Sequence, residues 1–129
     1  MIGKALQADK AGSGYMFLIE EDGVLVGRAS LNSVIRGAFQ SASVSYAVDA
    51  SSGGRGIATR ALRTLTNIGF GNLGLHRLQG ETLIENRASQ RVMERCGFHW
   101  YGTAPNYLRV HGRWREHHLY QLIDDAWAE

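Results

Sequence analysis

A glycine-rich segment near the middle of the chain is the first candidate for chemistry. The stretch Ser51-Ser52-Gly53-Gly54-Arg55-Gly56 follows a strand-like run and precedes a helical pattern. The first-turn amides of a helix have no intrahelical partner and carry a partial positive charge of about half a unit. Glycines would let a diphosphate approach that backbone closely, so the segment predicts an anion site.

Two common phosphate-binding motifs do not fit this segment. The Walker loop requires Gly-Lys followed by Ser or Thr, and the segment contains no lysine. The dinucleotide fingerprint requires three glycines, of which Gly54 and Gly56 supply two, while Thr59 occupies the third position. A sharp strand-to-helix turn also needs glycine, so the residues alone leave a purely structural role open.

Cysteine and histidine residues in the second half of the chain could in principle bind zinc or form a covalent intermediate. Cys96 ends the apolar face of an expected helix, which favours a buried structural thiol over a covalent acetyl-cysteine. His111, His117 and His118 match no zinc-ligand spacing, and the adjacent pair on a strand would point to opposite faces. We therefore expect no metal site.

Strand and turn signals dominate the first part of the chain. Residues 1–14 are small and polar and predict a short helix or a tail. A hairpin should join a strand at 15–19 to one at 24–31 through the turn at 21–23. A further alternating strand is expected at 43–48, directly before the glycine-rich segment.

The second part alternates helical and strand patterns. A helix should begin at Gly56 and end near residues 69–74, because Ile57, Ala61, Leu65 and Ile68 recur at helical spacing. The elements expected after it are a strand at 75–83, a helix at 88–96, and a hairpin of 107–110 with 114–123. The second helix should have Ala88, Val92 and Cys96 on one face and end at Gly97. Trp100, Trp114 and Trp127 are expected in the core or at an interface.

Composition restricts the class of protein. The 129 residues suffice for one domain, 1–129, and the element order indicates an α/β or α+β fold with a mainly antiparallel sheet. A net charge of +2 is too small to indicate direct nucleic-acid binding. The single cysteine, the absence of a signal-like start and the lack of a long apolar run favour a cytoplasmic protein without membrane association.

Three stretches, in this order, resemble the GNAT superfamily of N-acetyltransferases. Gly53-x-x-Gly56-x-Ala58 resembles its acetyl-CoA loop, Q/R-x-x-G-x-G/A. Asn86-Arg87-Ala88-Ser89, followed by Gly97-Phe98, is similar to its later helix, N-x-x-S…GF. The stretch Tyr107-Leu108-x-x-x-Gly112-x-Trp114-x-Glu116-His117 is similar to the tail of the RimJ/RimL-like ribosomal-protein-alanine N-acetyltransferases.

The resemblance implies a GNAT-like mixed, mainly antiparallel, splayed sheet with helices on both faces, and acetyl-CoA as cosubstrate in the splay. Members of the superfamily usually carry a strand and one or two helices before the hairpin that starts here at Tyr15. Only about 14 residues precede it in this chain. We therefore expect shortened N-terminal elements, and either a shortened member or a homodimer in which a second copy completes the acceptor site.

The resemblance also implies where acetyl-CoA would be held. Gly53 stands where Gln or Arg is usual, which removes a side chain but leaves the backbone amides. Asn86 equally suits a helix N-cap, and the two roles are compatible. The expected cosubstrate contacts are Val48, Gly53, Gly54, Arg55, Gly56, Ile57, Ala58, Thr59, Asn86, Ser89 and Arg91.

Acetyl transfer to an amine needs a neutral nucleophile, donors for the developing oxyanion and a proton for the leaving thiolate. The resemblance points to Glu81, five residues before Asn86, as the base, and to Glu116, where Asp is usual, as a second candidate. Ser89 or Tyr107 would protonate the thiolate. The structural alternatives are a solvated strand-face carboxylate for Glu81, an ion pair or backbone contact for Glu116, a backbone-bonded serine for Ser89 and hairpin packing for Tyr107.

The resemblance implies an acyltransferase that acetylates a protein N-terminus, such as that of a ribosomal protein, by direct attack in a ternary complex. An α-amine with a pKa of about 8 is neutral in roughly one molecule in ten at neutral pH, whereas a lysine with a pKa of about 10.4 is so in fewer than one in a thousand. A water-relayed carboxylate would therefore suffice for an N-terminal acceptor. Two other functions stay open: acetylation of a small amine such as an antibiotic or polyamine, and a non-catalytic acyl-CoA-binding module.

Overall fold

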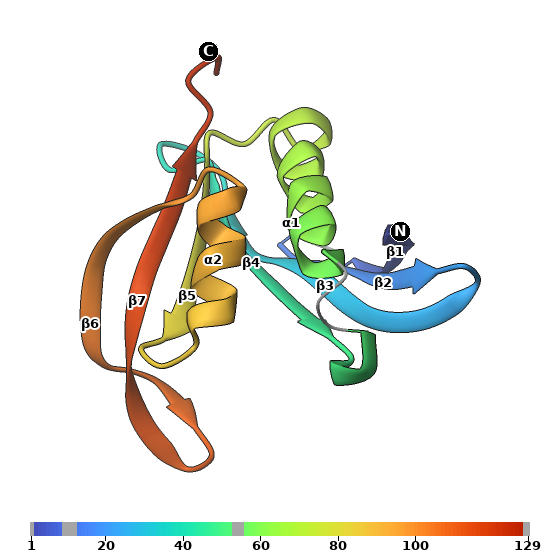
Figure 1. Cartoon of the computed structure of the whole chain (residues 1–129). Coiled ribbons are helices and arrows are strands. Elements are labelled where there is room, and N and C mark those ends of the chain that lie inside the picture. Colours follow the sequence, from blue (N-terminus) through green and yellow to red (C-terminus); the bar gives the residue numbers. More distant parts are fainter. Residues whose placement is uncertain (1, 9–12, 53–55, 128–129) are drawn as a thin grey trace.

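The computed structural model describes residues 2–8, 13–52 and 56–127. These residues form one seven-stranded mixed sheet and two α-helices (Figure 1). The elements are β1 (Ile2–Ala8), β2 (Tyr15–Glu21), β3 (Val24–Ile35), β4 (Ser41–Val48), α1 (Ile57–Asn67), β5 (Arg77–Leu83), α2 (Arg87–Arg95), β6 (His99–Val110) and β7 (Arg113–Ile123). The predicted mixed, mainly antiparallel fold class is confirmed.

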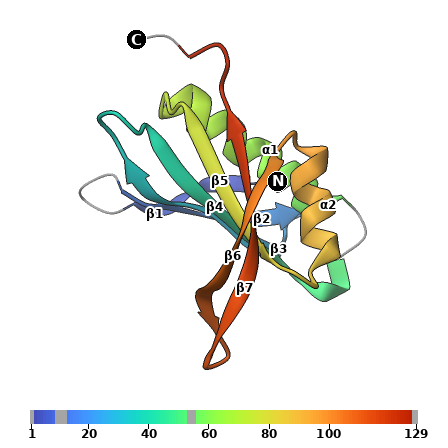
Figure 2. The same ribbon diagram turned by 90° about the vertical axis from the view of Figure 1, so that its left-hand side faces the viewer.

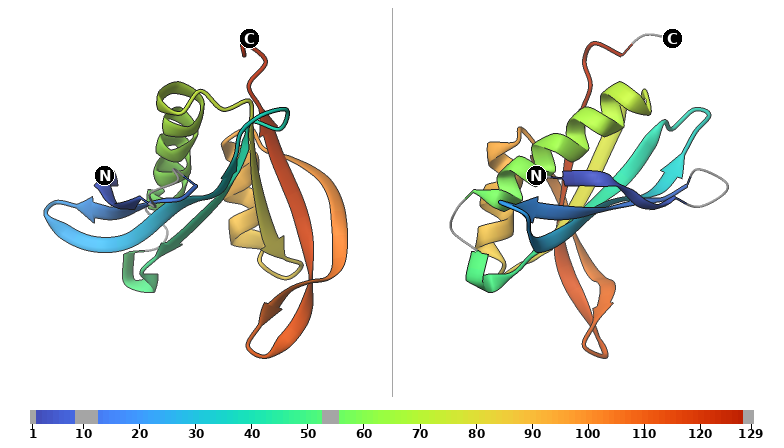
Figure 3. Two further views of the ribbon diagram at one scale, coloured as in Figure 1. Left: turned by 180° about the vertical axis from the view of Figure 1, so that it is seen from behind. Right: turned by 90° about the vertical axis from the view of Figure 1, so that its right-hand side faces the viewer.

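The sheet divides into two wings that meet at β4 and β5. The strand order is β1-β2-β3-β4-β5-β7-β6, and every neighbouring pair is antiparallel except β4 with β5. That parallel pair is short, because only Ser41, Ala42 and Ser43 have partners on β5. Beyond them the two strands diverge into a V, visible from the front in Figure 1 and from behind in Figure 3. The predicted splay is therefore present.

Both helices cover the same face of the sheet. Arg63 of α1 donates to the backbone oxygen of Arg95 at the end of α2, so the helices lie side by side (Figure 2). Their buried residues Leu62, Leu65 and Met93 belong to one core with apolar residues of the sheet. The expectation of helices on both faces is therefore met on one face only, because in the described residues the other face carries no helix.

The packing of α2 depends on a close approach to β5. A Cβ atom on Gly80 would lie 2.3 Å from the Cε of Met93 and 3.2 Å from a methyl group of Val44. Met93 is consequently the buried residue of α2, whereas Ala88 is exposed. The predicted face of α2 was thus wrong at Ala88, while Val92 and Cys96 do pack against the edge of the core.

Three further details differ from the sequence-based predictions. Residues 2–8 form β1, paired antiparallel with β2, rather than a helix or a tail. Strand β6 begins at His99, eight residues before the predicted strand at 107. Of the two places expected for Trp100 and Trp114, the core is excluded and an interface is not, because their side chains are 59% and 61% exposed. Among the described residues no helix is long and apolar enough to cross a membrane.

Candidate active site

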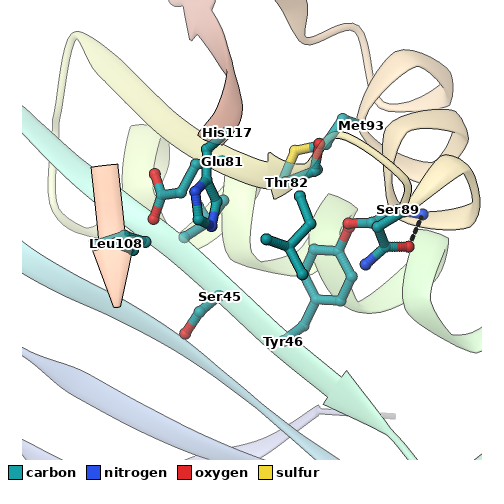
Figure 4. Close-up of a pocket in the computed structure, with 11 residues that line it drawn as sticks. Ser45, Tyr46, Glu81, Thr82, Ser89, Met93, Leu108 and His117 are labelled. Carbon is teal, nitrogen blue, oxygen red and sulfur yellow. Dashed lines mark hydrogen bonds between the residues drawn. The ribbon is translucent and has the colours of Figure 1, made fainter. Parts of the chain in front are cut away.

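A pocket of about 260 Å³ occupies the opening between β4 and β5 (Figure 4). It is lined by both strands, by the start of α2 and by single residues of β6 and β7. The lining residues are Val44, Ser45, Tyr46, Glu81, Thr82, Leu83, Asn86, Ser89, Met93, Leu108 and His117. The sheet is open here, so the pocket receives side chains from both of its faces.

Strand β4 presents backbone to this opening. On one side its residues pair with β3 as far as Val48, but on the other side pairing with β5 stops at Ser43. Within the described residues, 44–48 therefore have no strand partner on the side that faces the pocket. Unpaired strand N–H and C=O groups are a template for an extended ligand.

Glu81 supplies a carboxylate at one end of the pocket. Its side chain is half-buried, and its Oε2 atom is fully buried without a hydrogen-bond partner among the described residues. Burial raises the pKa of Glu81, although the Gln79 amide and the nearby His117 act in the opposite direction. A desolvated carboxylate with one oxygen that lacks a donor is poised to accept a proton.

His117 lies beside Glu81 and is only 4% exposed (Figure 4). Its Nδ1 lies 2.9 Å from the backbone oxygen of Arg115. A carbonyl oxygen can only accept, so Nδ1 carries the hydrogen. In the sequence His117 ended the tail motif and was one of the residues considered as zinc ligands, but it was given no catalytic role. Its place in the pocket follows from the register that pairs Glu81 with Leu119 and Leu83 with His117, which no local pattern discloses.

Two hydroxyl groups meet at the other end of the pocket. The hydroxyl oxygens of Ser89 and Tyr46 are 2.9 Å apart, and the Ser89 amide donates to Asn86 Oδ1 at 3.1 Å. Asn86 is therefore the predicted N-cap of α2. Burial raises the pKa of Tyr46, against the effect of the Ser89 hydroxyl. Tyr46 is a site residue that sequence reasoning missed, although the alternation of its strand would have placed it on the core face.

The structure separates the remaining catalytic candidates. Glu116 is exposed and does not line the pocket, unlike Glu81. Tyr107 packs its ring against His117, with centroids 5.8 Å apart, and its hydroxyl accepts from Gln79 at 3.1 Å. Burial, followed by the charge of Glu81, raises the pKa of Tyr107. Tyr107 thus belongs to the packing around the pocket but not to its wall.

Arg77 organises the helix-free face beside Tyr107. Its guanidinium donates to Gln121 at 2.7 Å, and to Ser41, Gln79 and Tyr101 at 3.0 Å each. The same Gln79 donates to Tyr107, so the network links the first residue of β5 to the pocket.

The start of α1 retains the properties of an anion site. Gly56 is the N-cap, with a left-handed φ of 71° that favours glycine, and no side chain caps the helix. The first turn contains no acidic residue, and the side chains of Ile57 and Thr59 are buried. Of the first three residues, therefore, the backbone amides and the side chain of Ala58 can face a ligand. Gly53, Gly54 and Arg55 lie outside the described residues.

Three other candidates lie away from the pocket. Val48 is half-buried at the end of β4, and Arg91 is exposed on α2. The Cys96 thiol is 3.5 Å from the Thr59 carbonyl oxygen, and burial raises its pKa, which suits a structural thiol. No group of residues that could hold a metal ion occurs in the described part of the chain.

Comparison with known proteins agrees with this geometry. Residues 1–99 match the model of the acetyltransferase (GNAT) domain. The chain belongs to the GNAT acetyltransferase family. This member is 36% identical over 103 residues to the probable N-acetyltransferase YjcK of Bacillus subtilis, which covers 80% of the chain and 57% of YjcK. It is 27% identical over 129 residues to the [ribosomal protein uS5]-alanine N-acetyltransferase of Escherichia coli, covering 98% of the chain and 66% of that enzyme.

Solved structures of two relatives superpose on this GNAT chain. Ribosomal-protein-S5-alanine acetyltransferase from Vibrio fischeri matches with a TM-score of 0.88 at 28% identity, over 93% of the chain and 67% of that protein. RimJ from Mycobacterium smegmatis, in complex with CoA-disulfide, matches with a TM-score of 0.87 at 35% identity, over 93% of the chain and 57% of RimJ. The chain thus spans 57% and 66% of the two curated relatives.

Proposed function

We propose that the chain transfers an acetyl group from acetyl-CoA to the N-terminal α-amine of a protein, a ribosomal protein being the leading acceptor. The observation that carries the proposal is the pocket in the splay. It has a desolvated carboxylate, Glu81, at one end and a hydroxyl pair, Ser89 with Tyr46, at the other. A proton acceptor and a proton donor on opposite sides of one opening are what amine acylation requires.

The residues present fit acetyl-CoA. The unpaired backbone of β4 at 44–48 can hydrogen-bond an extended amide-containing arm, and Asn86 lines the same opening. The uncapped amides of α1 suit a pyrophosphate. When bound there, the thioester would supply an activated acyl carbon between the two ends of the pocket.

In this proposal the two ends of the pocket handle different protons. The Glu81 end takes a proton from the ammonium form of the acceptor, directly or through one water molecule. The neutral nitrogen then forms the C–N bond as the C–S bond breaks. The Ser89 hydroxyl protonates the leaving thiolate, and the second proton lost by the nitrogen returns to the Ser89–Tyr46 pair. Tyr46 can replenish Ser89 through their 2.9 Å contact.

An α-amine acceptor is favoured over other amines by two observations. Two relatives are named as acetyltransferases of an alanine of a ribosomal protein, and a third solved structure is named as an α-N-protein acetyltransferase of ribosomal L7/L12. Among the described lining residues Glu81 is the only carboxylate, whereas a polyamine with several charges is best held by several. Spermidine N-acetyltransferases superpose at only 20% identity and are therefore evidence for the fold alone.

The test is a free-thiol assay with acetyl-CoA and a panel of N-terminal peptides, lysine peptides, spermidine and an aminoglycoside. We expect turnover with the N-terminal peptides and at least a tenfold loss in Ser89→Ala. In parallel, millimolar acetyl-CoA should raise the melting temperature, because a ligand that binds only the native state stabilises it. Preference for spermidine or the aminoglycoside would assign a small-amine acceptor. A melting shift without any turnover would indicate a binding module.

A further inference from the structure

His117 is a buried titratable group with no role in the proposed reaction. The ring lines the pocket at the end occupied by Glu81, and Figure 4 shows the two side chains next to each other. Both project from the helix-free face of neighbouring antiparallel strands, since Glu81 is opposite Leu119 and His117 is two residues along. Such diagonal neighbours are within reach of long side chains.

The tautomer of His117 is set by the backbone. Because Nδ1–H donates to the Arg115 carbonyl oxygen, the lone pair of the neutral ring lies on Nε2. No hydrogen-bond partner of Nε2 occurs within the described residues. The ring is thus held by one nitrogen while the other is free to accept a proton, the arrangement expected of a general base whose orientation is fixed by a second group.

We infer that His117 is a second catalytic residue, and that Glu81 and His117 act as one proton-accepting pair at the acceptor end of the pocket. This inference rests on the proposed acetyl transfer. One proton leaves the acceptor ammonium for His117 Nε2, and the Glu81 carboxylate stabilises the resulting imidazolium. The neutral amine forms the C–N bond while the C–S bond breaks, its second proton ends on the thiolate sulfur, and His117 returns its proton to solvent.

The surroundings of the ring suit a cation that forms transiently. Glu81 approaches it from β5 with a negative charge, whereas the charge of Glu85, from the turn before α2, is paired with that of Arg115. Tyr107 of β6 packs its ring against the imidazole, and Tyr46 of β4 lines the same pocket.

The choice of imidazole matches the proposed acceptor. The ordinary pKa of an imidazole, about 6.5, lies little more than one unit below that of an α-amine, so proton transfer from an α-ammonium to an imidazole costs little free energy. The pKa of a lysine ammonium lies about two units or more above that of an α-ammonium. The pair is therefore expected to favour α-amines over lysine side chains.

The test compares His117→Asn with His118→Asn. The asparagine amide can replace Nδ1–H toward the Arg115 carbonyl but offers no base at the position of Nε2. His118 is the matched control on the same strand, because its Nδ1 contacts Thr103 and its ring contacts Trp100, outside the pocket. Thermal melting without acetyl-CoA tests whether each variant is folded, and the shift on adding acetyl-CoA tests whether the variant binds the cosubstrate.

The pH dependence of kcat is measured with both substrates saturating, so that the free acceptor's own titration does not enter. We expect His117→Asn to lose on the order of 10²-fold in kcat and to shift the acid limb of the profile to lower pH, as Glu81 is left alone. His118→Asn should retain the wild-type kcat and the wild-type acid limb. An unchanged acid limb in an active His117→Asn overturns the inference and leaves acetyl transfer standing. Absence of turnover in the wild type overturns both.

A second readout does not depend on turnover. The imidazole carbon and nitrogen resonances of His117, assigned by their loss in His117→Asn, are titrated in the wild type and in Glu81→Gln. Removal of the carboxylate should move the titration of His117 to lower pH, because the negative charge favours the imidazolium. An unmoved titration would show that the two groups do not form a pair.

Discussion

Replacing Glu81 by Gln should abolish most turnover and yet stabilise the fold at neutral pH. Burial raises the pKa of this carboxyl above its ordinary value of 4.5, so the native state binds the proton more tightly than the unfolded chain. The ionised form is therefore destabilising, and its cost grows as pH rises from 4.5 through the native pKa. Glutamine keeps the shape and removes the charge.

The size of the effect follows from the environment of Oε2. A buried polar atom without a partner costs about 1–3 kcal/mol, and a charged one costs more. Glutamine leaves a polar amide in the same place, so the variant gains only the additional cost of the charge. We expect the lower end, about 1 kcal/mol, because Glu81 is half-buried and Gln79 and His117 partly favour its charge. At about 2.1 cal/mol/K per residue, unfolding of 129 residues has an entropy of about 0.27 kcal/mol/K, so 1 kcal/mol corresponds to about 4 °C.

The assay is urea unfolding of wild type, Glu81→Gln and Glu116→Gln between pH 4 and pH 8. The advantage of Glu81→Gln should be largest at pH 7–8 and vanish below about pH 4.5, where Glu81 is protonated in both states. Glu116 is exposed, so its variant should follow the wild type throughout. A Glu81→Gln variant less stable than the wild type at pH 7, or an advantage that grows toward acid pH, would refute the reasoning.

Three further predictions concern cosubstrate binding, core packing and the network on the helix-free face. Ala58→Glu should weaken acetyl-CoA binding about tenfold relative to the isosteric Ala58→Gln, because it places a negative charge at the proposed anion site. The free energy of unfolding without ligand should stay within about 0.5 kcal/mol of the wild type. Equal affinities of the two variants would exclude that site. Gly80→Ala should cost about 1–3 kcal/mol in urea, because its Cβ would overlap Met93. Arg77→Lys should cost a similar amount, because an ammonium group cannot donate to four acceptors in a fixed planar arrangement.

Features written into short segments of sequence were predicted well. The β2–β3 turn is at Asp22-Gly23, where both residues have a positive φ. Asn86 caps α2, and the helix ends before Gly97 as expected. Gly56 likewise precedes α1. Each of these depends on the backbone preference of one or two residues and their immediate neighbours, which sequence displays directly.

Features that depend on strand register were missed. The sequence of β1, IGKALQA, has a single β-branched residue and no aromatic residue, so its strand signal is weak, and its pairing with β2 contains two register shifts. His117 and Tyr46 reach the pocket only because β7 and β4 pair with β5 and β3 in one particular register. The burial of Glu81 has the same origin, since its solvated and desolvated states are indistinguishable until the neighbouring strands are placed.

The position of the pocket follows from how β5 is attached to β4. The amides of His76 and Arg77 both donate to the Gln40 backbone oxygen, at 2.8 and 3.1 Å, and the Arg77 guanidinium bonds Ser41 on the same strand. These contacts pin the two strands together at one end. The twist of neighbouring strands then separates them at the other end, because no hydrogen bonds hold 44–48 to β5. The opening, and with it the distance between the Glu81 and Ser89 ends, is thus set by Arg77 without its taking part in the chemistry.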